Sequence, residues 1–305
     1  MTTPIQTPEI APQPSAAVIA PRHRRRSRRP SGTLVAGLAL VGLFAAAALL
    51  APWLAPADPT ALLLERRLEP PSPGHPLGFD ELGRDVLSRL LFGARASLAV
   101  ALAVVGLAAT LGTALGAVAG YRGGRVDGAL MRATDVFLAF PGILLAIALV
   151  AVLGPGLGHV VLALVAFGWV DYARLARGQV LQVREADYVA AARVAGVRGP
   201  AIVWRHVLPN VLPTLLVQAS LGMAGAILAE SALSFLGLGL RPPTPSWGGM
   251  IDAGRGHLVD APHLAVFPGL ALFAVVLGLN LLADGLGDRL GRAAPRSHAD
   301  PKRAL

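Results

Sequence analysis

The sequence contains no cysteine, which excludes disulfides and metal sites built from thiolates. It has a single lysine, Lys302, and no glycine-rich run precedes a Lys-Ser or Lys-Thr pair, so no phosphate-binding loop is present. The Gly-x-Ser-x-Gly pattern of serine hydrolases is also absent. The histidines are scattered and include no H-E-x-x-H helix. We therefore predict no catalytic residue and no bound metal in this chain.

Charge is also scarce. Only 15% of the residues are charged, against about 25% in a soluble globular protein. With a mean hydropathy of +0.60, the chain has too few charges to cover a surface that faces water. The length alone would suit two soluble domains, but the long apolar runs indicate one polytopic membrane unit instead. The net charge of +9 would also suit nucleic-acid binding, and the placement of the basic residues argues against it.

Residues 1–31 are rich in proline and threonine and end in an arginine run at 22–29. They have no apolar periodicity, so we expect a disordered cytosolic tail that forms no core. Its position beside an apolar segment suits contact with anionic lipid head groups. The run contains no aromatic residue on which bases could stack, which disfavours a nucleic-acid arm.

Six apolar segments follow. A hydrocarbon layer about 30 Å thick needs about 20 helical residues, and the sequence predicts an all-α polytopic protein with spans at 32–56, 96–121, 136–157, 158–172, 207–229 and 264–283. The fourth span is shorter than the others and ends beside Asp171. The expected organisation is a tail at 1–31, a first transmembrane helix and outer loop at 32–95, a five-helix core at 96–290 and a second cytosolic tail at 291–305.

The basic residues predict the orientation of these spans. If the N-terminus is inside, 20 of the 27 Lys and Arg residues fall on the cytoplasmic side and 7 on the outer side, so both termini are expected in the cytosol. A rival interpretation is a cleaved signal peptide, with Ser27-Arg28-Arg29 as a twin-arginine signal and a cleavage site at 55–57. The apolar run is longer than a usual signal-peptide core of about 7–15 residues, and five more spans follow, which favours a retained helix.

Residues 184–207, which we call the elbow, form a polar stretch between two apolar segments. Acidic residues near its start suit a helix N-terminus, and Tyr188, Ala191, Ala192 and Ala195 are spaced to share one small apolar face. Gly196 can adopt positive φ and end this helix. Pro200 suits the first turn of a second helix. The pattern predicts a helix–turn–helix in the cytosol; an ordinary interfacial amphipathic loop is the alternative.

Charged residues outside the elbow offer two further candidates. Asp80, Arg84, Asp85 and Arg89 precede the second span, and Asp85 and Arg89 have the i, i+4 spacing of a helical ion pair. These groups form either a local ion pair at the outer surface or a contact with substrate or a binding protein. Glu230 is the one acid at the end of a long apolar run. It lies either on a substrate pathway or at the outer interface.

Three ordered motifs resemble one family. Residues 75–89 read HPLGFDELGRDVLSR and are followed by GARASL at 93–98; the elbow carries the alanine triplet, glycine and Leu-Pro spacing of an "EAA" loop; residues 230–239 read ESALSFLGLG, with PSWG at 245–248. This set resembles the permease subunits of ABC importers for dipeptides, oligopeptides or nickel over about residues 33–290. The chain departs from the family pattern at Phe79 for Thr, Ala190 for Glu, His206 for Ile and Gly287 for Arg.

The resemblance implies the fold of a type I importer permease in the bacterial inner membrane, moving di- or oligopeptides or a nickel chelate into the cytosol. It implies four kinds of contact: a second homologous permease, two cytosolic ATPase subunits that bind ATP, a periplasmic or lipid-anchored binding protein, and membrane lipid. The implied coupling residues are Tyr188, Ala190, Ala191, Ala192, Gly196, His206, Leu208 and Pro209. Candidate pathway or outer-face residues are Asp80, Arg84, Asp85, Glu230 and Trp247.

The resemblance leaves the substrate open, and no cofactor on this chain is expected. Two other classes remain as alternatives. A polytopic membrane enzyme would place charged residues inside its spans, and this chain has almost none there. A membrane scaffold would never co-purify with ATPase subunits.

Overall fold

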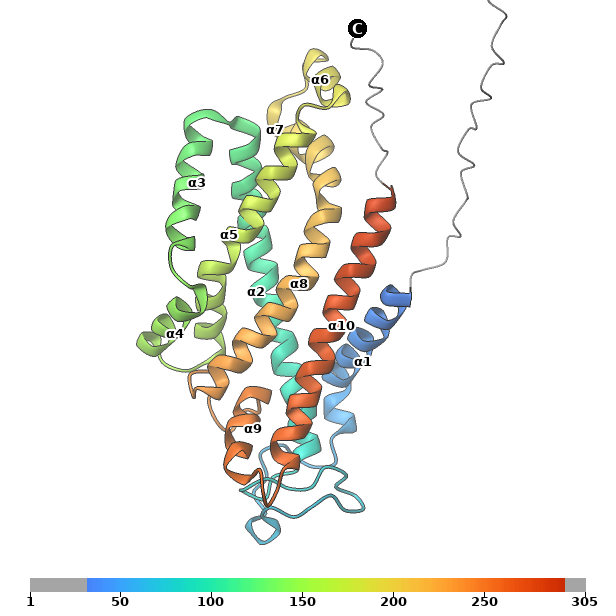
Figure 1. Ribbon diagram of the computed structural model, residues 1–305, viewed down its shortest axis with the longest axis vertical. Helices are drawn as coiled ribbons and strands as arrows, with labels where there is room; N and C mark the ends of the chain where they lie inside the picture. Colours follow the sequence, from blue (N-terminus) through green and yellow to red (C-terminus); the bar gives the residue numbers. More distant parts are fainter. Residues whose placement is uncertain (1–31, 294–305) are drawn as a thin grey trace, which may run out of the picture.

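The computed structural model describes residues 32–293. The predicted tail at 1–31 lies outside this range, as does the predicted tail at 291–305 except for residues 291–293, which belong to a helix. Within this range the chain is helical and forms no strand, only two isolated β-bridges in the loop at 55–85. Figure 1 shows an elongated bundle. The elbow lies at one end, which we call the elbow end, while the loop at 55–85 and the short helix α9 lie at the other, the loop end.

Five helices are long and apolar enough to cross a membrane. They are α1 (Gly32–Leu54), α2 (Val86–Arg122), α5 (Leu157–Val183), α8 (Leu208–Phe235, continuous with the helical turns from Gly199) and α10 (His263–Ala293). A sixth candidate is a bent pair, α3 (Gly124–Leu138) and α4 (Gly142–Leu153), whose axes differ by 77°. The all-α prediction is confirmed for the described residues, which hold five candidate membrane spans, or six if the bent pair counts as one.

The prediction of a continuous third span at 136–157 is wrong. The helix breaks at residues 139–141, and Pro141 has extended backbone angles as the N-cap of α4. Proline has no N–H to donate and disfavours a helical conformation in the residue before it, so an apolar run of sufficient length is divided here.

Four helices extend beyond the predicted spans: α2, α5, α8 and α10. α2 begins at Val86 because the Asp85 side chain accepts a hydrogen bond from the backbone N–H of Ser88 and caps it. α5 continues past the predicted end at 172 to Val183. Its added turns carry Arg177, whose guanidinium forms an ion pair with Asp127 of α3. The predicted span ended beside Asp171, but the helix continues past it, and Arg174 and Arg177 in the added turns have acidic partners on the neighbouring α3.

Glycines form a close seam between α2 and α5. Gly112, Gly116 and Gly120 recur every four residues on the face of α2 that meets α5. A Cβ at Gly112 or Gly116 would overlap the backbone of Trp169 or Ala173, and one at Gly120 would lie 2.9 Å from the carbonyl oxygen of Arg177. Small residues let two helix backbones approach in this way. The seam therefore holds residues 112–120 of α2 against residues 169–177 of α5.

Candidate functional site

The elbow contains two short helices at the end of the bundle (Figure 1). α6 (Asp187–Val194) starts after the extended Ala186, with the acidic Asp187 in its first turn, where a negative charge suits the helix dipole. α7 (Gly199–Ile202) has Pro200 in its first turn and continues through a π-helical turn, Val203–Val207, into α8. The predicted helix–turn–helix is therefore present as a structure, and its second helix runs directly into a long apolar one.

Gly196 ends α6 as predicted. Its φ is +77°, in the left-handed region that favours glycine. Its N–H donates to the carbonyl of Arg193, and the N–H of Val197 donates to the carbonyl of Ala192. This pair of bonds is the Schellman motif, which satisfies the last carbonyls of a helix.

The alanine face of α6 differs from the prediction in one residue. Tyr188, Ala190, Ala191 and Ala195 are exposed. Ala192 instead turns inward and packs beside the fully buried Val189. The predicted shared face is therefore wrong for Ala192, because its position one turn after Val189 places it on the side that meets the bundle. The exposed surface consists of small side chains around one tyrosine.

The remaining candidate coupling residues lie where the elbow joins α8. His206 belongs to the π-helical turn and is half-buried, and its carbonyl accepts a hydrogen bond from Asn210. The N–H of Leu208 reaches back to the carbonyl of Val203, and Pro209, which has no N–H, follows directly. A proline lacks the backbone N–H that a helix needs, and its ring crowds the preceding turn. A wider π-helical turn before a proline is therefore common.

Leu208 and Pro209 also line a groove of about 970 Å³ between α2 and the helices α7 and α8. Its lining is almost entirely apolar, with Tyr121 and Arg122 at its elbow end. It presents no carboxylate and no imidazole.

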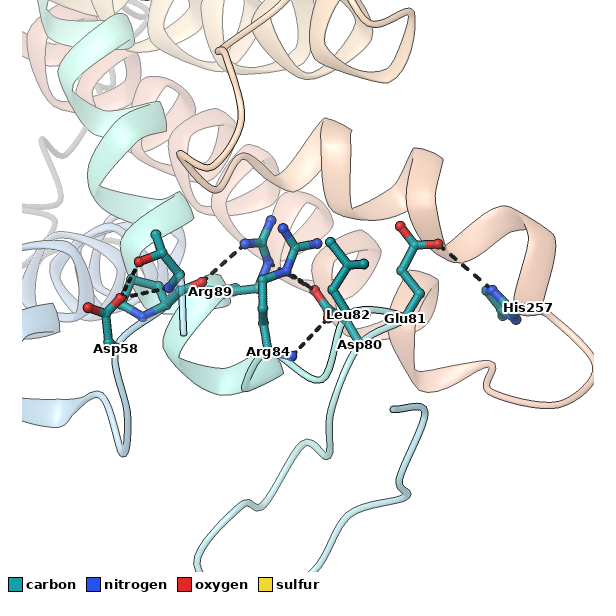
Figure 2. A network of polar contacts seen from close by, with 9 residues as sticks. Asp58, Asp80, Glu81, Leu82, Arg84, Arg89 and His257 are labelled. Carbon is teal, nitrogen blue, oxygen red and sulfur yellow. Dashed lines mark hydrogen bonds and ion pairs between the residues drawn. The ribbon is translucent and has the colours of Figure 1, made fainter. Parts of the chain in front are cut away.

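At the loop end, Asp80 is the centre of a buried polar cluster (Figure 2). Its Oδ2 accepts a hydrogen bond from Arg84 Nε at 2.7 Å, and Arg89 Nε lies 3.4 Å from the same oxygen. Its Oδ1 accepts from the backbone N–H groups of Leu82 and Arg84. One carboxylate thus holds two guanidinium groups and one turn of the backbone.

The predicted ion pair between Asp85 and Arg89 is wrong. Asp85 uses one oxygen to cap α2 and the other to contact His75 Nδ1 at 2.8 Å. Arg89 turns instead toward Asp80 and the carbonyl of Pro59. An N-capping carboxylate points at the backbone of its own first turn, so it does not lie over the residue one turn later as a mid-helix residue would.

These charges are not free to meet a ligand. At 9% exposure or less, Asp80, Arg84, Asp85 and Arg89 are enclosed by the loop and the start of α2, which favours the local, structural interpretation. Less buried polar groups lie beside them. Glu81 reaches His257 at 3.9 Å, and a hydrogen bond from His257 lowers the pKa of Asp260. Hydrogen bonds from Thr60 likewise lower the pKa of Asp58.

Glu230 and Trp247 are also enclosed. Glu230 is fully buried in α8, with hydroxyl groups of Ser234, Ser97 and Ser231 at 2.8, 3.3 and 3.4 Å from its carboxylate. The predicted place at the outer interface is therefore wrong for Glu230, because α2 and α9 cover this part of α8. Trp247, at the start of α9 (Trp247–Gly254), is only 2% exposed. Both side chains lie inside the bundle, where they join helices.

Three contacts around the elbow were not anticipated from the sequence. Arg184 donates to the carbonyl of Gly120 at 2.7 Å, Arg193 lies over the ring of Tyr121, and that ring packs against Gly199. One feature of the sequence could have indicated them: Tyr121 is an aromatic residue at the end of an apolar run, just before Gly123-Gly124.

Comparison with known proteins gives consistent matches. The family model described as the binding-protein-dependent transport system inner membrane component matches residues 112–294. A glutathione transport system permease protein of Pectobacterium atrosepticum is 45% identical over 267 residues, covering 87% of this chain and 88% of that protein. A dipeptide transport system permease protein of Alkalihalophilus pseudofirmus is 38% identical over 291 residues, covering 94% of this chain and 96% of that protein.

Proposed function

Since the chain belongs to the family of inner-membrane components of binding-protein-dependent transport systems, we propose that it is one of two permease subunits of an ATP-driven importer. In this proposal the importer carries short peptides from the periplasm into the cytosol. The resemblance found in its motifs is confirmed at the level of the family. We propose three further points: that this chain transports while partner subunits hydrolyse ATP, which partners it binds, and which cargo it carries.

The observation that carries the proposal is the form of the elbow. It lies within the region that matches the family, at one end of the bundle, and presents Tyr188, Ala190 and Ala191 outward. Alanine side chains let the backbone of a partner approach closely, and the Gly196 turn gives this surface a fixed shape. We propose that an ATPase subunit seats the elbow in a groove, and that movements driven by ATP enter the permease here. Ala190 in place of glutamate removes one charged contact from this surface.

A second permease is supported by the interior of the bundle. The buried side chains between α2, α5 and α8 are packed, and the groove of about 970 Å³ is apolar and lies on the side of the bundle. A peptide has charged ends and polar amides, which an apolar passage does not accommodate. We therefore propose that the pathway forms between this chain and a homologous permease, with membrane lipid around both.

The orientation follows from the distribution of arginines. We propose that the elbow end faces the cytosol, because α1 runs toward the loop end and α10 runs back from it, and basic residues concentrate toward the elbow end. The loop end, with the loop at 55–85 and α9, would then meet a periplasmic or lipid-anchored binding protein. ATP would be bound by the partner ATPase subunits, and this chain would bind no cofactor of its own.

The relatives guide the choice of cargo. Their names state glutathione and dipeptide transport, and both are short peptides. A nickel chelate remains the alternative cargo. The described residues contain no group of three His, Asp or Glu side chains placed to hold a metal ion, so a metal would travel inside its chelator.

The test is reconstitution. The chain is co-expressed with the second permease, the ATPases and the binding protein of its own system, and uptake of labelled dipeptides into vesicles is measured with and without ATP. We expect ATP-dependent uptake, co-purification of the ATPases, and no ATP hydrolysis by this chain alone. ATPases that never co-purify would support the scaffold alternative, and chemical conversion of a substrate by this chain alone would support the enzyme alternative.

A further inference from the structure

The C-terminal end of α2 is held by the elbow on several sides. Arg184, at the end of α5, donates from Nη1 to the carbonyl of Gly120 at 2.7 Å. Arg193 of α6 places its guanidinium carbon 5.7 Å from the centre of the Tyr121 ring. These contacts come from two different helices and meet on two consecutive residues of α2.

α7 reaches the same ring. A Cβ built on Gly199 would lie 3.3 Å from Cε1 of Tyr121, closer than side chains normally pack, so the ring fits against this glycine because it has no side chain. Tyr121 is half-buried and packs in the cluster that contains Val189 of α6 and Ile202 of α7. The ring therefore contacts both arms of the elbow at once.

Few other contacts hold α6. It has eight residues, and Val189 is its one fully buried side chain. Hydrogen-bonded turns at 184–186 and 195–198 separate it from α5 and α7. The position of α6 relative to α2 therefore depends on the contact between Arg193 and Tyr121 together with the packing of Val189 and Ala192.

α2 is suited to carry a displacement away from this point. Its 37 residues include no proline, whereas α8 and α10 each contain one inside the helix. At its other end, the Asp85 cap connects α2 to the loop end through His75. A push on Tyr121 thus acts on one uninterrupted helix that reaches the opposite end of the molecule.

We infer that Tyr121 is a positioning residue for coupling: its ring, held between Arg193 and Gly199, passes displacement of the elbow into α2. This inference rests on the proposed docking of an ATPase on the elbow. It goes further, because it names the contact through which the elbow acts, at Tyr121, and the helix that receives the movement, α2. Tyr121 itself touches neither ATP nor cargo, and it acts through α2.

The experiment uses the complete transporter in vesicles and measures the number of ATP molecules hydrolysed for each peptide imported. Tyr121→Ala is expected to retain the ATPase subunits and to raise this ratio about tenfold, a change typical of the loss of coupling between two sites. Tyr121→Phe keeps the ring and should restore the wild-type ratio. A variant that was merely less stable would lower hydrolysis and import together and leave the ratio unchanged.

Arg193→Gln tests the same contact from the elbow, without changing the core. It should raise the ratio about two- to fivefold, in line with the strength of an exposed cation–π contact. In combination with Tyr121→Ala it should add little, because the two residues act through one contact. Arg125→Gln is the matched control, since it removes an exposed guanidinium from the start of α3, outside the elbow, and it should leave the ratio unchanged.

A wild-type ratio in both Tyr121→Ala and Arg193→Gln would overturn the inference while leaving the proposed function intact. If Tyr121→Ala does not assemble, a wild-type ratio in Arg193→Gln alone would overturn it. Failure of the wild-type chain to bind ATPases or to import peptides would instead contradict the proposed function, so the two failures are distinguishable.

Discussion

The indole N–H of Trp247, in α9, donates a hydrogen bond to the backbone carbonyl of Leu90, in α2, over 2.9 Å. The same ring packs against Phe44 of α1, with the ring centres 5.7 Å apart, and against Gly93, where a Cβ would lie 2.8 Å from the indole. One side chain therefore fastens the short helix at the loop end to two long helices.

We predict that Trp247→Ala lowers the free energy of unfolding by about 3 kcal/mol or more, as removal of a buried aromatic side chain generally does. Trp247→Phe keeps most of the packing and loses the hydrogen bond, so a decrease of about 1 kcal/mol is expected. The measurement is thermal unfolding in detergent. Trp204→Phe is the control, because that ring is 74% exposed. Equal midpoints for Trp247→Ala and the wild type would contradict this prediction.

Glu230 should tolerate replacement by its amide but not by a hydrocarbon. Glu230→Gln still offers an oxygen to the serine hydroxyls around it, so near-normal stability is expected. Glu230→Leu leaves buried hydroxyl groups without their acceptor, at a cost of about 1–3 kcal/mol each when unsatisfied. The yield of folded protein in detergent and its unfolding midpoint measure this. Glu65→Leu, at an exposed position, is the control. The prediction fails if Glu230→Leu unfolds at the same temperature as Glu230→Gln.

Gly196→Val should uncouple transport while leaving the protein inserted. A Cβ at Gly196 meets no atom within 4 Å, so the obstacle is its φ of +77°, which a β-branched residue strongly disfavours. The Schellman turn is then expected to shift and to move Ala191 away from its position. Uptake of labelled peptide and retention of ATPase subunits are measured in parallel. Gly128→Val, at an open helical position in α3, is the control. Normal uptake with normal ATPase retention in Gly196→Val would show that the elbow is not the coupling site.

Both chain termini are predicted to be cytosolic, from the distribution of 20 and 7 basic residues on the two sides. A reporter that is active only in the periplasm, fused after residue 305, should be inactive. The same reporter inserted in the loop at 55–85 should be active and provides the control. An active C-terminal fusion would mean an odd number of crossings, as when the pair α3 and α4 does not span the membrane.

The sequence predicted those features that depend on local chemistry. The end of α6 at Gly196 follows from one residue that permits positive φ, and the class of the fold follows from long apolar segments. The proline at 141 could also have indicated the break. The prediction relied on hydropathy instead, and a break in the helix does not change the apolar content of the segment.

The partners of charged groups were not predictable in the same way. Asp85 was expected to pair with Arg89 along a helix, but it lies at the helix cap, and the chain folds back to bring His75 to it. Glu230 looks exposed at the end of an apolar run, and it is buried because α2, far away in sequence, covers it. Such contacts depend on the tertiary arrangement, which spacing along one helix does not specify.

The glycine seam between α2 and α5 has a mechanical consequence. Since their backbones approach closely at Gly112, Gly116 and Gly120, we expect the two helices to tilt together as one lever. The 37 residues of α2 make this lever about 55 Å long at 1.5 Å per residue. A tilt of only about 5° about one end would displace the other end by about 5 Å, roughly one helical turn. A small rotation imposed on one side of the membrane is thereby magnified into a displacement on the other that is comparable to the width of an extended peptide.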